Sequence, residues 1–287
     1  MKAVVGRAVT HLDGKWVEGN PPVLGPMTHA TWLASFVFDG ARAFEGYAPD
    51  LDLHCRRCIE SGQALGLESP VDATEMEMIA WDGIHQFDDS TELYVRPMLF
   101  GVDGFMVPEP ETTGFMLSVY EAQIPNINTT FTACLSTRKR PLPEMAPTDA
   151  KCSALYPNVA RMFREATAKG FVTAVVLDPW DNVAEFANAN LFMVKDGVVH
   201  TPEINGTFLN GITRQRVINL LLENGTNVQE RVIKYEELLD ADEVFSSGNW
   251  AKVQTCSQIE GQHYQPGPVF FSAREAYWSW ARTTLRK

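Results

Sequence analysis

The sequence has few features of a secreted, membrane-spanning or nucleic-acid-binding protein. Its 287 residues include five cysteines, an odd number that forms no disulfide framework and suits a reducing compartment. No stretch reaches the roughly 18 apolar residues of a membrane helix, and the N-terminus lacks the apolar core of a secretory signal. The formal net charge of -12 argues against general affinity for nucleic acid or anionic membranes. We therefore expect a cytoplasmic protein with neither nucleic acid nor membrane among its partners.

Several common site signatures are also missing. The chain has no Walker motif, no dinucleotide-binding glycine fingerprint and no GxSxG nucleophile elbow. Its six histidines are scattered without metal-ligand spacing. The stretch CRRC (55–58) has the spacing of a redox or zinc pair, but no second pair exists. On a helix it merely places two small residues on one face, so we predict no metal site.

The residues that are present predict a soluble α/β protein in two parts. With 45% hydrophobic and 21% charged residues, the chain can fill one large core or two smaller ones. The segment QIPNINTT (123–130) loses periodicity and gathers proline and asparagine. We therefore predict a small N-terminal domain over 1–122, an interdomain loop over 123–130 and a larger domain over 131–287.

Periodicity and turn residues predict the individual elements. Residues 51–67 predict a helix capped by Asp52, whose apolar positions include Leu53, Ile59, Ala64 and Leu65. Further helices are expected at 157–170, beginning on Pro157 and closing at Gly170, and at 210–225. Strands are expected at 91–100, 112–122, 132–140, 171–178, 227–233 and 242–247, and a hairpin at 190–202 around Asp196-Gly197.

Lys151 lies in TDAKCSALYPN (148–158), an otherwise small and apolar stretch in front of a predicted helix. Desolvation lowers the pKa of an amine in an apolar pocket and makes it a nucleophile toward aldehydes. A lysine in such a place is more often an ordinary surface residue, and the stretch alone leaves both interpretations open. Glu185 lies between a buried strand and the hairpin, and its surroundings in the sequence also leave a structural and a functional interpretation open. A turn carboxylate is usually solvated, but one that points inward needs a cationic partner.

Two turns and one arginine are candidates for holding an anion. In LNGITRQR (209–216) a glycine permits close approach, and free N–H groups open a helix, which suits a phosphate as well as an ordinary helix start. In SSGNWAKV (246–253) a turn of small residues follows a strand and can present N–H groups. Arg57 lies on the 51–67 helix, where its guanidinium suits a phosphate, although a solvated helix face is the default.

The order of these segments resembles that of the class IV, pyridoxal-phosphate-dependent aminotransferases. The run comprises a lysine with a tyrosine five residues later, then V-x-E before a hairpin ending GVVHTP, then LNGITR. Upstream, THATWLASFVFDGARAFEG (28–46), H-x-x-R from His54 to Arg57 and YVRP (94–97) look like the branched-chain aminotransferase branch. The resemblance covers nearly the whole chain.

The resemblance implies a role for each matching residue. Lys151 forms the Schiff base with pyridoxal 5′-phosphate, Glu185 pairs with the pyridinium nitrogen, and Tyr156 bonds the phenolic oxygen. The phosphate is held by Arg57, Gly211, Ile212, Thr213, Gly248 and Asn249. The substrate pocket is lined by Leu33, Phe38, Tyr94, Arg96 and Trp250.

The resemblance also implies an architecture and a reaction. The fold is type IV, with a small N-terminal and a larger C-terminal α/β domain, the cofactor between them, and a pocket completed by a second subunit of a homodimer or larger homo-oligomer. Lys151 moves a proton from the substrate Cα to the cofactor as base and then acid. The amino group passes from an amino acid, preferably a branched-chain-like L-amino acid, to a 2-oxo acid by a ping-pong mechanism.

Several departures from the branched-chain pattern keep other functions open. Leu33 stands where a tyrosine is usual, and Gly248-Asn249-Trp250 replaces Gly-Thr-Ala. These changes suit an amine transaminase selective for R-configured amines, which is the main alternative. A D-amino-acid aminotransferase is less favoured because its arginine-x-histidine pattern is absent, and aminodeoxychorismate lyase is weaker still. A non-enzymatic binding protein would require loss of Lys151, Glu185 or the phosphate turn, and the chain has all three.

Overall fold

A computed structural model describes residues 6–284 and divides them into two compact units. Unit 1 comprises residues 6–124, 149–154 and 283–284, and unit 2 comprises residues 125–148 and 155–282. The short segment 149–154 therefore returns to unit 1 and brings Lys151 with it. The division of the chain into domains at 1–122, 123–130 and 131–287 stays a prediction.

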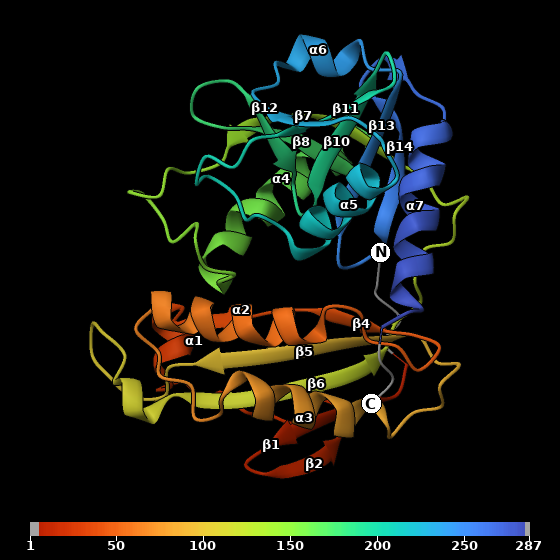
Figure 1. Cartoon of the computed structure of the whole chain (residues 1–287). Helices are drawn as coiled ribbons and strands as arrows, with labels where there is room; N and C mark the ends of the chain where they lie inside the picture. Colours follow the sequence, from red (N-terminus) through yellow and green to blue (C-terminus); the bar gives the residue numbers. More distant parts are fainter. Residues whose placement is uncertain (1–5, 285–287) are drawn as a thin grey trace. The chain divides into compact units, whose positions relative to one another are not determined.

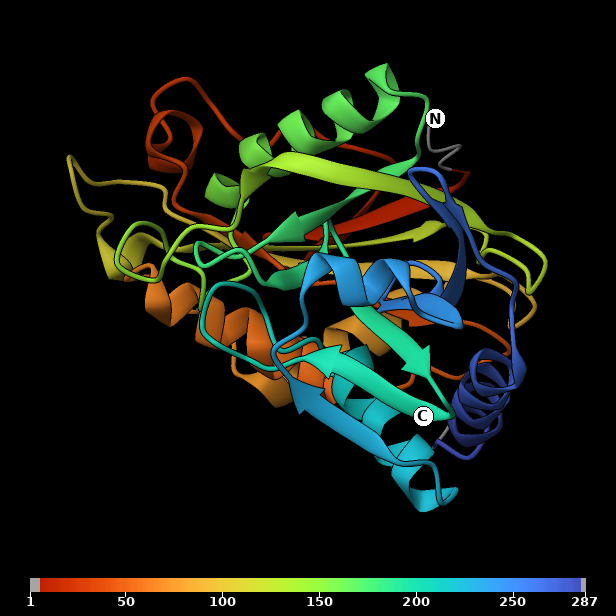
Figure 2. The same cartoon turned by 90° about the horizontal axis from the view of Figure 1, so that it is seen from above.

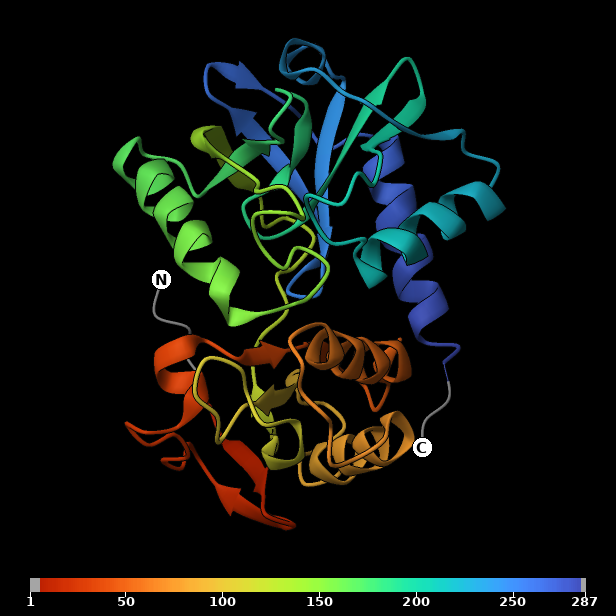
Figure 3. The same ribbon diagram turned by 90° about the vertical axis from the view of Figure 1, so that its left-hand side faces the viewer.

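Unit 1 is built on one antiparallel sheet of six strands. The strand order is β2-β1-β6-β5-β3, and β4 also pairs with β5. The helices α2 and α3 pack against β5 and β6, as Figures 1 and 3 show. The strands are β1 (Ala8–Leu12), β2 (Lys15–Glu18), β3 (Phe36–Phe38), β4 (Ala41–Ala43), β5 (Leu93–Phe100) and β6 (Gly114–Glu121). The helices are α1 (His29–Leu33), α2 (Leu51–Ala64), α3 (Ala73–Ile84) and the 3-10 turn Pro110–Thr112.

Strand β5 shows the alternation of a strand with one core face. Leu93, Val95 and Leu99 are buried, whereas Tyr94 and Arg96 between them are only partly buried. Because successive side chains point to opposite faces, Tyr94 and Arg96 share the face turned away from the buried leucines and valine. The predicted strand at 91–100 is confirmed, and its polar face is available for a site.

Helix α2 is where predicted, but its cap and its buried face were predicted wrongly. The N-cap is Asp50, in the left-handed conformation, and Asp52 lies in the first turn. The buried face is made by small residues such as Cys55, Cys58 and Gly62. A Cβ on Gly62 would lie 2.9 Å from the Leu99 side chain, so the helix approaches β5 very closely. The predicted apolar positions are half-buried or exposed: Leu53, Ile59, Ala64 and Leu65.

Unit 2 is built on a mixed sheet of nine strands. The order is β12-β11-β10-β13-β14-β7-β8-β9, with β15 pairing with β14. Pairs β11/β12, β14/β7 and β7/β8 are parallel, and the others are antiparallel. The strands are β7 (Phe131–Lys139), β8 (Thr173–Leu177), β9 (Val183–Phe186), β10 (Asn190–Lys195), β11 (Val198–Pro202), β12 (Val228–Arg231), β13 (Glu243–Gly248), β14 (Lys252–Ile259) and β15 (Gln262–His263).

The helices of unit 2 cover the sheet. They are α4 (Tyr156–Ala168), preceded by the 3-10 turn Ser153–Leu155, α5 (Ile212–Glu223), α6 (Tyr235–Leu239) and α7 (Pro268–Ala281). Helix α4 packs against β7 and β8, while α5 and α7 lie side by side over β13 and β14, as Figures 2 and 3 show. Within residues 6–284, no helix has the length and hydropathy needed to cross a membrane.

Local turn chemistry explains where these elements begin and end. Pro157 lies in the first turn of α4, where its missing N–H leaves no helix bond unmade. Gly170 follows the helix with φ +86°, a left-handed conformation that glycine adopts without steric cost. Asp196 and Gly197 join β10 to β11 with φ 50° and 76°, as a two-residue primed turn requires. The predicted helix and hairpin are therefore confirmed.

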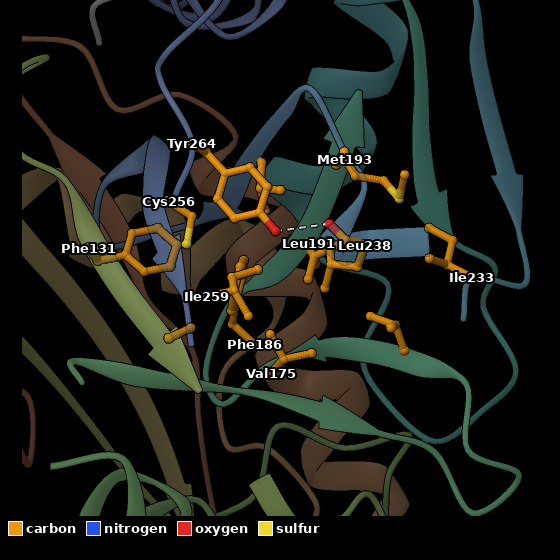
Figure 4. Close-up of a cluster of buried hydrophobic side chains, with 14 residues drawn as sticks. Phe131, Val175, Phe186, Leu191, Met193, Ile233, Leu238, Cys256, Ile259 and Tyr264 are labelled. Carbon is orange, nitrogen blue, oxygen red and sulfur yellow. Dashed lines mark hydrogen bonds between the residues drawn. The ribbon is translucent and has the colours of Figure 1, made fainter. Parts of the chain in front are cut away.

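The core of unit 2 holds the short strand β9 in place. The ring of Phe186, in β9, packs edge-on against Phe131 of β7, with centroids 4.9 Å apart (Figure 4). In the same cluster the Tyr264 hydroxyl donates a hydrogen bond of 3.1 Å to the Leu238 carbonyl, which satisfies its polar group inside the core. Because β9 also carries Glu185, this apolar packing fixes the backbone of a candidate site residue.

The stacked rings of Phe192 and Phe245 provide a test of this core. They are register partners in β10 and β13, both fully buried, with centroids 5.1 Å apart and planes 3° from parallel. We expect Phe245→Ala to lower the free energy of unfolding by about 3–5 kcal/mol, since it removes a large buried ring and leaves a cavity. Urea unfolding monitored by circular dichroism measures the change. The exposed Phe271 supplies the control variant Phe271→Ala, and equal losses in both variants would contradict the account.

Candidate functional site

In unit 1, Arg57 is bound to a buried carboxylate. The Asp39 side chain is fully buried and accepts from Arg57 Nε at 2.7 Å and Nη2 at 2.9 Å, and from His54 Nδ1 at 2.7 Å. Burial alone would raise the pKa of Asp39, but the charges and hydrogen bonds of Arg57 and His54 outweigh it and hold that pKa well below 3.8. Arg57 is therefore no solvated helix residue, because two of its nitrogens are fixed by an ionised carboxylate.

Lys151 is held against two elements of unit 1 by its own backbone. Its N–H donates to Ser61 Oγ of α2 at 3.0 Å, and its carbonyl accepts from the Phe38 N–H at 3.1 Å. Next to it, Cys152 forms an isolated antiparallel bridge with Val37. The Lys151 amine lies 5.3 Å from the centroid of the Phe38 ring. The structure thus brings together two predicted site residues, Lys151 and Phe38, that are more than a hundred positions apart in sequence.

Two stacked aromatic rings and two arginines lie on one face of the sheet, on the neighbouring strands β4, β5 and β6. Tyr94 and Tyr120 are register partners with ring centroids 5.3 Å apart, and Arg96 lies 5.0 and 5.2 Å from their centroids. Arg96 Nη2 donates to the Tyr120 hydroxyl, whose pKa burial raises to about 12. The guanidinium of the buried Arg42 lies 5.7 Å from the Tyr94 centroid, and burial lowers its pKa to about 10.

This face has the chemistry of a pocket for an anionic ligand. Among the described residues, no carboxylate lies within ion-pair distance of Arg96. Stacked rings around a guanidinium leave its charge available while excluding water from its faces. Of the predicted substrate residues, Tyr94 and Arg96 belong to this cluster, whereas Leu33 ends the separate helix α1.

In unit 2, Glu185 lies on strand β9 with 9% of its surface exposed. It points inward and has the cationic partner that burial requires, since Arg140 Nη2 lies 2.9 Å from Glu185 Oε1. Arg140 is itself fixed by the carbonyl of Ala187 at 2.7 Å. The sequence did not reveal this partner. Arg140 follows Arg138 and Lys139, and nothing in the row of three cations marks the one that turns inward.

Asn190 connects Glu185 to the start of α5. Its Nδ2 donates to Glu185 Oε2 at 3.3 Å and to the carbonyl of Leu209 at 3.1 Å. A Cβ on Gly211 would lie only 2.1 Å from Asn190 Oδ1, so this close approach requires glycine. Gly211 caps α5, and the first helical residues Ile212 and Thr213 are buried behind it. The predicted anion turn and the predicted carboxylate are therefore parts of one network.

The turn between β13 and β14 fits an oxyanion. It contains Gly248 and Asn249, with Trp250 exposed at its tip. In the described part of the chain, Ser247 Oγ and Asn249 Nδ2 are buried without a hydrogen-bond partner. Buried donors of this kind are normally satisfied, and a phosphate or carboxylate supplies the acceptor oxygens that they lack. Tyr156, the remaining predicted cofactor residue, is exposed at the first position of α4.

Two further features concern the His, Cys, Asp and Glu side chains. Among residues 6–284, no group of three or more His, Cys, Asp or Glu side chains is placed to hold a metal ion. All five cysteines are free and buried, and burial raises the pKa values of Cys55 and Cys58. A thiol with a raised pKa is a poor nucleophile, so the CRRC stretch serves the packing of α2.

Comparisons with known sequences agree with the predicted resemblance. The family described as "Amino-transferase class IV" matches residues 36–259. The probable branched-chain-amino-acid aminotransferase of Rickettsia bellii is 29% identical over 254 residues, which cover 87% of this chain and 86% of the relative. The branched-chain-amino-acid aminotransferase of Escherichia coli K12 is 29% identical over 280 residues, which cover 92% of this chain and 90% of the relative.

A solved structure is similar over nearly the whole chain. An aminotransferase from Brucella abortus bound to the cofactor PLP matches with a TM-score of 0.95 and 44% identity, covering 97% of this chain and 100% of that one. The predicted mixed α/β fold of type IV is thus confirmed.

Asp39→Asn tests whether the Asp39 carboxylate anchors Arg57. At about pH 7 we expect the variant to lose about 3–5 kcal/mol of unfolding free energy, because the buried His54 and the partly buried Arg57 lose their counter-charge. The difference in unfolding free energy between the wild type and the variant is largest above pH 3.8. It declines as the pH falls toward the lowered pKa of Asp39 in the folded protein, since the native carboxyl then takes up a proton. Urea titrations of both proteins at steps down to about pH 2 measure this, and a difference independent of pH would contradict it.

Proposed function

The chain belongs to the class IV aminotransferase family, and on that premise we propose that it transfers an amino group between an amino acid and a 2-oxo acid with pyridoxal 5′-phosphate. When bound, this cofactor supplies an aldehyde and a protonated ring that withdraws electrons. The observation that carries the proposal is Lys151, a lysine fixed by its backbone to two elements with its amine over the Phe38 ring. Because the backbone of Lys151 is fixed, its amine can return to the aldehyde carbon of the cofactor in each reaction cycle.

Lys151 has two tasks in this proposal. Its amine would hold the cofactor through the aldehyde carbon, with release of water, and once freed by the amino donor it would accept the proton from the donor Cα and pass it on. Glu185 holds the proton on the ring nitrogen. The Arg140 guanidinium at 2.9 Å and the Asn190 amide at 3.3 Å support this role, because they fix the position of the carboxylate.

The resemblance assigns the cofactor phosphate to three groups of donors. Arg57, oriented by Asp39, supplies the cation. The start of α5 at Ile212 and Thr213 supplies free N–H groups, and the turn at Gly248 and Asn249 supplies further donors. Tyr156 is assigned to the phenolic oxygen, a role that the resemblance alone supports.

We assign the donor to the branched-chain-like L-amino acids. The named relatives are branched-chain-amino-acid aminotransferases, which favours this donor over R-configured amines, D-amino acids and aminodeoxychorismate. Phe38 offers an apolar wall, and Arg96 with Tyr94 offers a site for a carboxylate, as in a dicarboxylic 2-oxo acid acceptor. Leu33 and Trp250 are assigned to the pocket on the resemblance.

Lys151→Ala tests the proposal directly. The wild-type protein mixed with pyridoxal phosphate should gain visible absorbance that L-leucine bleaches, because the amino group of L-leucine would pass to the cofactor and release the lysine amine unchanged. Lys151→Ala should hold the cofactor without that absorbance and lose transamination by at least about a thousandfold, since both the anchor and the proton-transfer group are gone. The exposed Lys139→Ala is the control. Substantial turnover in Lys151→Ala, or bleaching only by an R-configured amine, would contradict the assignment.

We further infer a homodimer in the cytoplasm. Several large apolar side chains of unit 1 are exposed, and Phe105 has 76% of its surface exposed. They include Met27, Trp32, Phe105, Met106 and Val107. The ring centroids of Trp32, on α1, and Phe105, in the loop that follows β5, lie 6.4 Å apart. This loop and α1 therefore share one apolar surface. Exposed apolar surface of this kind marks an interaction site. The five free, buried cysteines support a reducing compartment.

Phe105→Asp tests the dimer. A charge in the apolar surface should separate the subunits and halve the mass measured by light scattering after size exclusion, because it desolvates on association. Met78 is also apolar and exposed, on α3, and Met78→Asp is the matched control that should leave the mass unchanged. A wild-type protein with the mass of one chain would contradict the dimer.

A further inference from the structure

Lys252 is a buried lysine in a strained position next to the β13–β14 turn. It is the first residue of β14, with 1% of its surface exposed and φ +59°. Lysine is almost never fully buried, and a left-handed conformation costs a residue other than glycine about 1–2 kcal/mol. An unbranched apolar residue would fill the same space without the cost of desolvating an ammonium group.

The contacts of Lys252 show what its charge does. Its Nζ donates to Asn249 Oδ1 at 2.8 Å and lies 5.7 Å from the ring centroid of Tyr277, a fully buried residue of α7. An ammonium group has three donors and no acceptor, so only the oxygen of the Asn249 amide can face it. The amide orientation is therefore determined, and Nδ2 is directed away from Lys252. Nδ2 is one of the buried donors that have no partner in the described part of the chain.

We propose that Lys252 is a positioning residue that locks the Asn249 amide so that its N–H groups bind an oxyanion. Ser247 Oγ is a second buried donor without a partner in residues 6–284. It lies on the same hairpin and is a second candidate to donate to the anion. Without Lys252 the amide can rotate and offer its oxygen instead, which repels an anion. The proposal rests on the proposed function, which supplies two oxyanions: the cofactor phosphate and the carboxylate of the amino donor.

The first test compares Lys252→Met with the wild type in the full-length protein. Methionine keeps the length and apolar stem of the side chain but removes the hydrogen bond. We expect the dissociation constant for pyridoxal phosphate or the KM for L-leucine to rise about tenfold, as for the loss of one buried polar contact. Lys195→Met removes a lysine that pairs with Asp240 at the far end of β10, and it should leave both constants unchanged.

Two arms of the test distinguish the oxyanions. A loss confined to pyridoxal phosphate, with the affinity for pyridoxal unchanged, assigns the phosphate to Asn249. A loss confined to KM for L-leucine, with pyridoxal phosphate affinity unchanged, assigns the donor carboxylate. If both constants match the wild type, the proposal is overturned and the proposed function stands. If the wild-type protein itself does not bind pyridoxal phosphate, the proposed function fails first.

Asn249→Asp provides a second test that does not depend on the folding of Lys252→Met. The new carboxylate keeps its contact with Lys252 but turns an oxygen toward the anion. We expect thermal stability without cofactor to be equal or higher, and the rise in Tm on adding pyridoxal phosphate or L-leucine to shrink. An undiminished rise would mean that no oxyanion meets residue 249, and that result would overturn the proposal.

Discussion

A carboxylate buried in each unit needs a cation beside it, and much of the site is arranged around that constraint. Asp39 is fully buried and Glu185 nearly so, and removing a carboxylate from water is prohibitive unless a paired charge and hydrogen bonds compensate. In unit 1 the compensating groups are Arg57 and His54 on α2. In unit 2 they are Arg140 at the end of β7 and Asn190 on β10. The pairs fix the side chains that are assigned to the cofactor.

Close backbone approach is the second condition for these pairs. Helix α2 can bring Arg57 to Asp39 because Cys55, Cys58 and Gly62 let it pack tightly on β5. In unit 2, Gly211 brings the start of α5 against Asn190, which in turn contacts Glu185. Small residues thus place the polar groups, and the apolar clusters around Phe186 hold the strands that carry them. The same few small residues therefore determine both the packing of the helices and the positions of the polar side chains.

The sequence predicted those elements whose chemistry is local. The Asp196-Gly197 turn, the start of α4 at Pro157 and the alternation in β5 follow from a few neighbouring residues. It missed Arg140, because that contact joins positions 45 apart and neighbouring cations look alike. The buried face of α2 was misplaced because small polar and sulfur-bearing residues, rather than large apolar ones, face the sheet. A buried Lys252 contradicts residue statistics, so only three-dimensional contacts reveal it.

The central claim is that Lys151 binds the cofactor aldehyde. Borohydride reduction of the protein loaded with pyridoxal phosphate makes that bond permanent, and digestion followed by mass spectrometry identifies the lysine that carries it. The account predicts a phosphopyridoxyl group on the peptide containing Lys151 and on no other lysine. A label on another lysine, such as the buried Lys252, or no label at all in a protein saturated with cofactor, would contradict it.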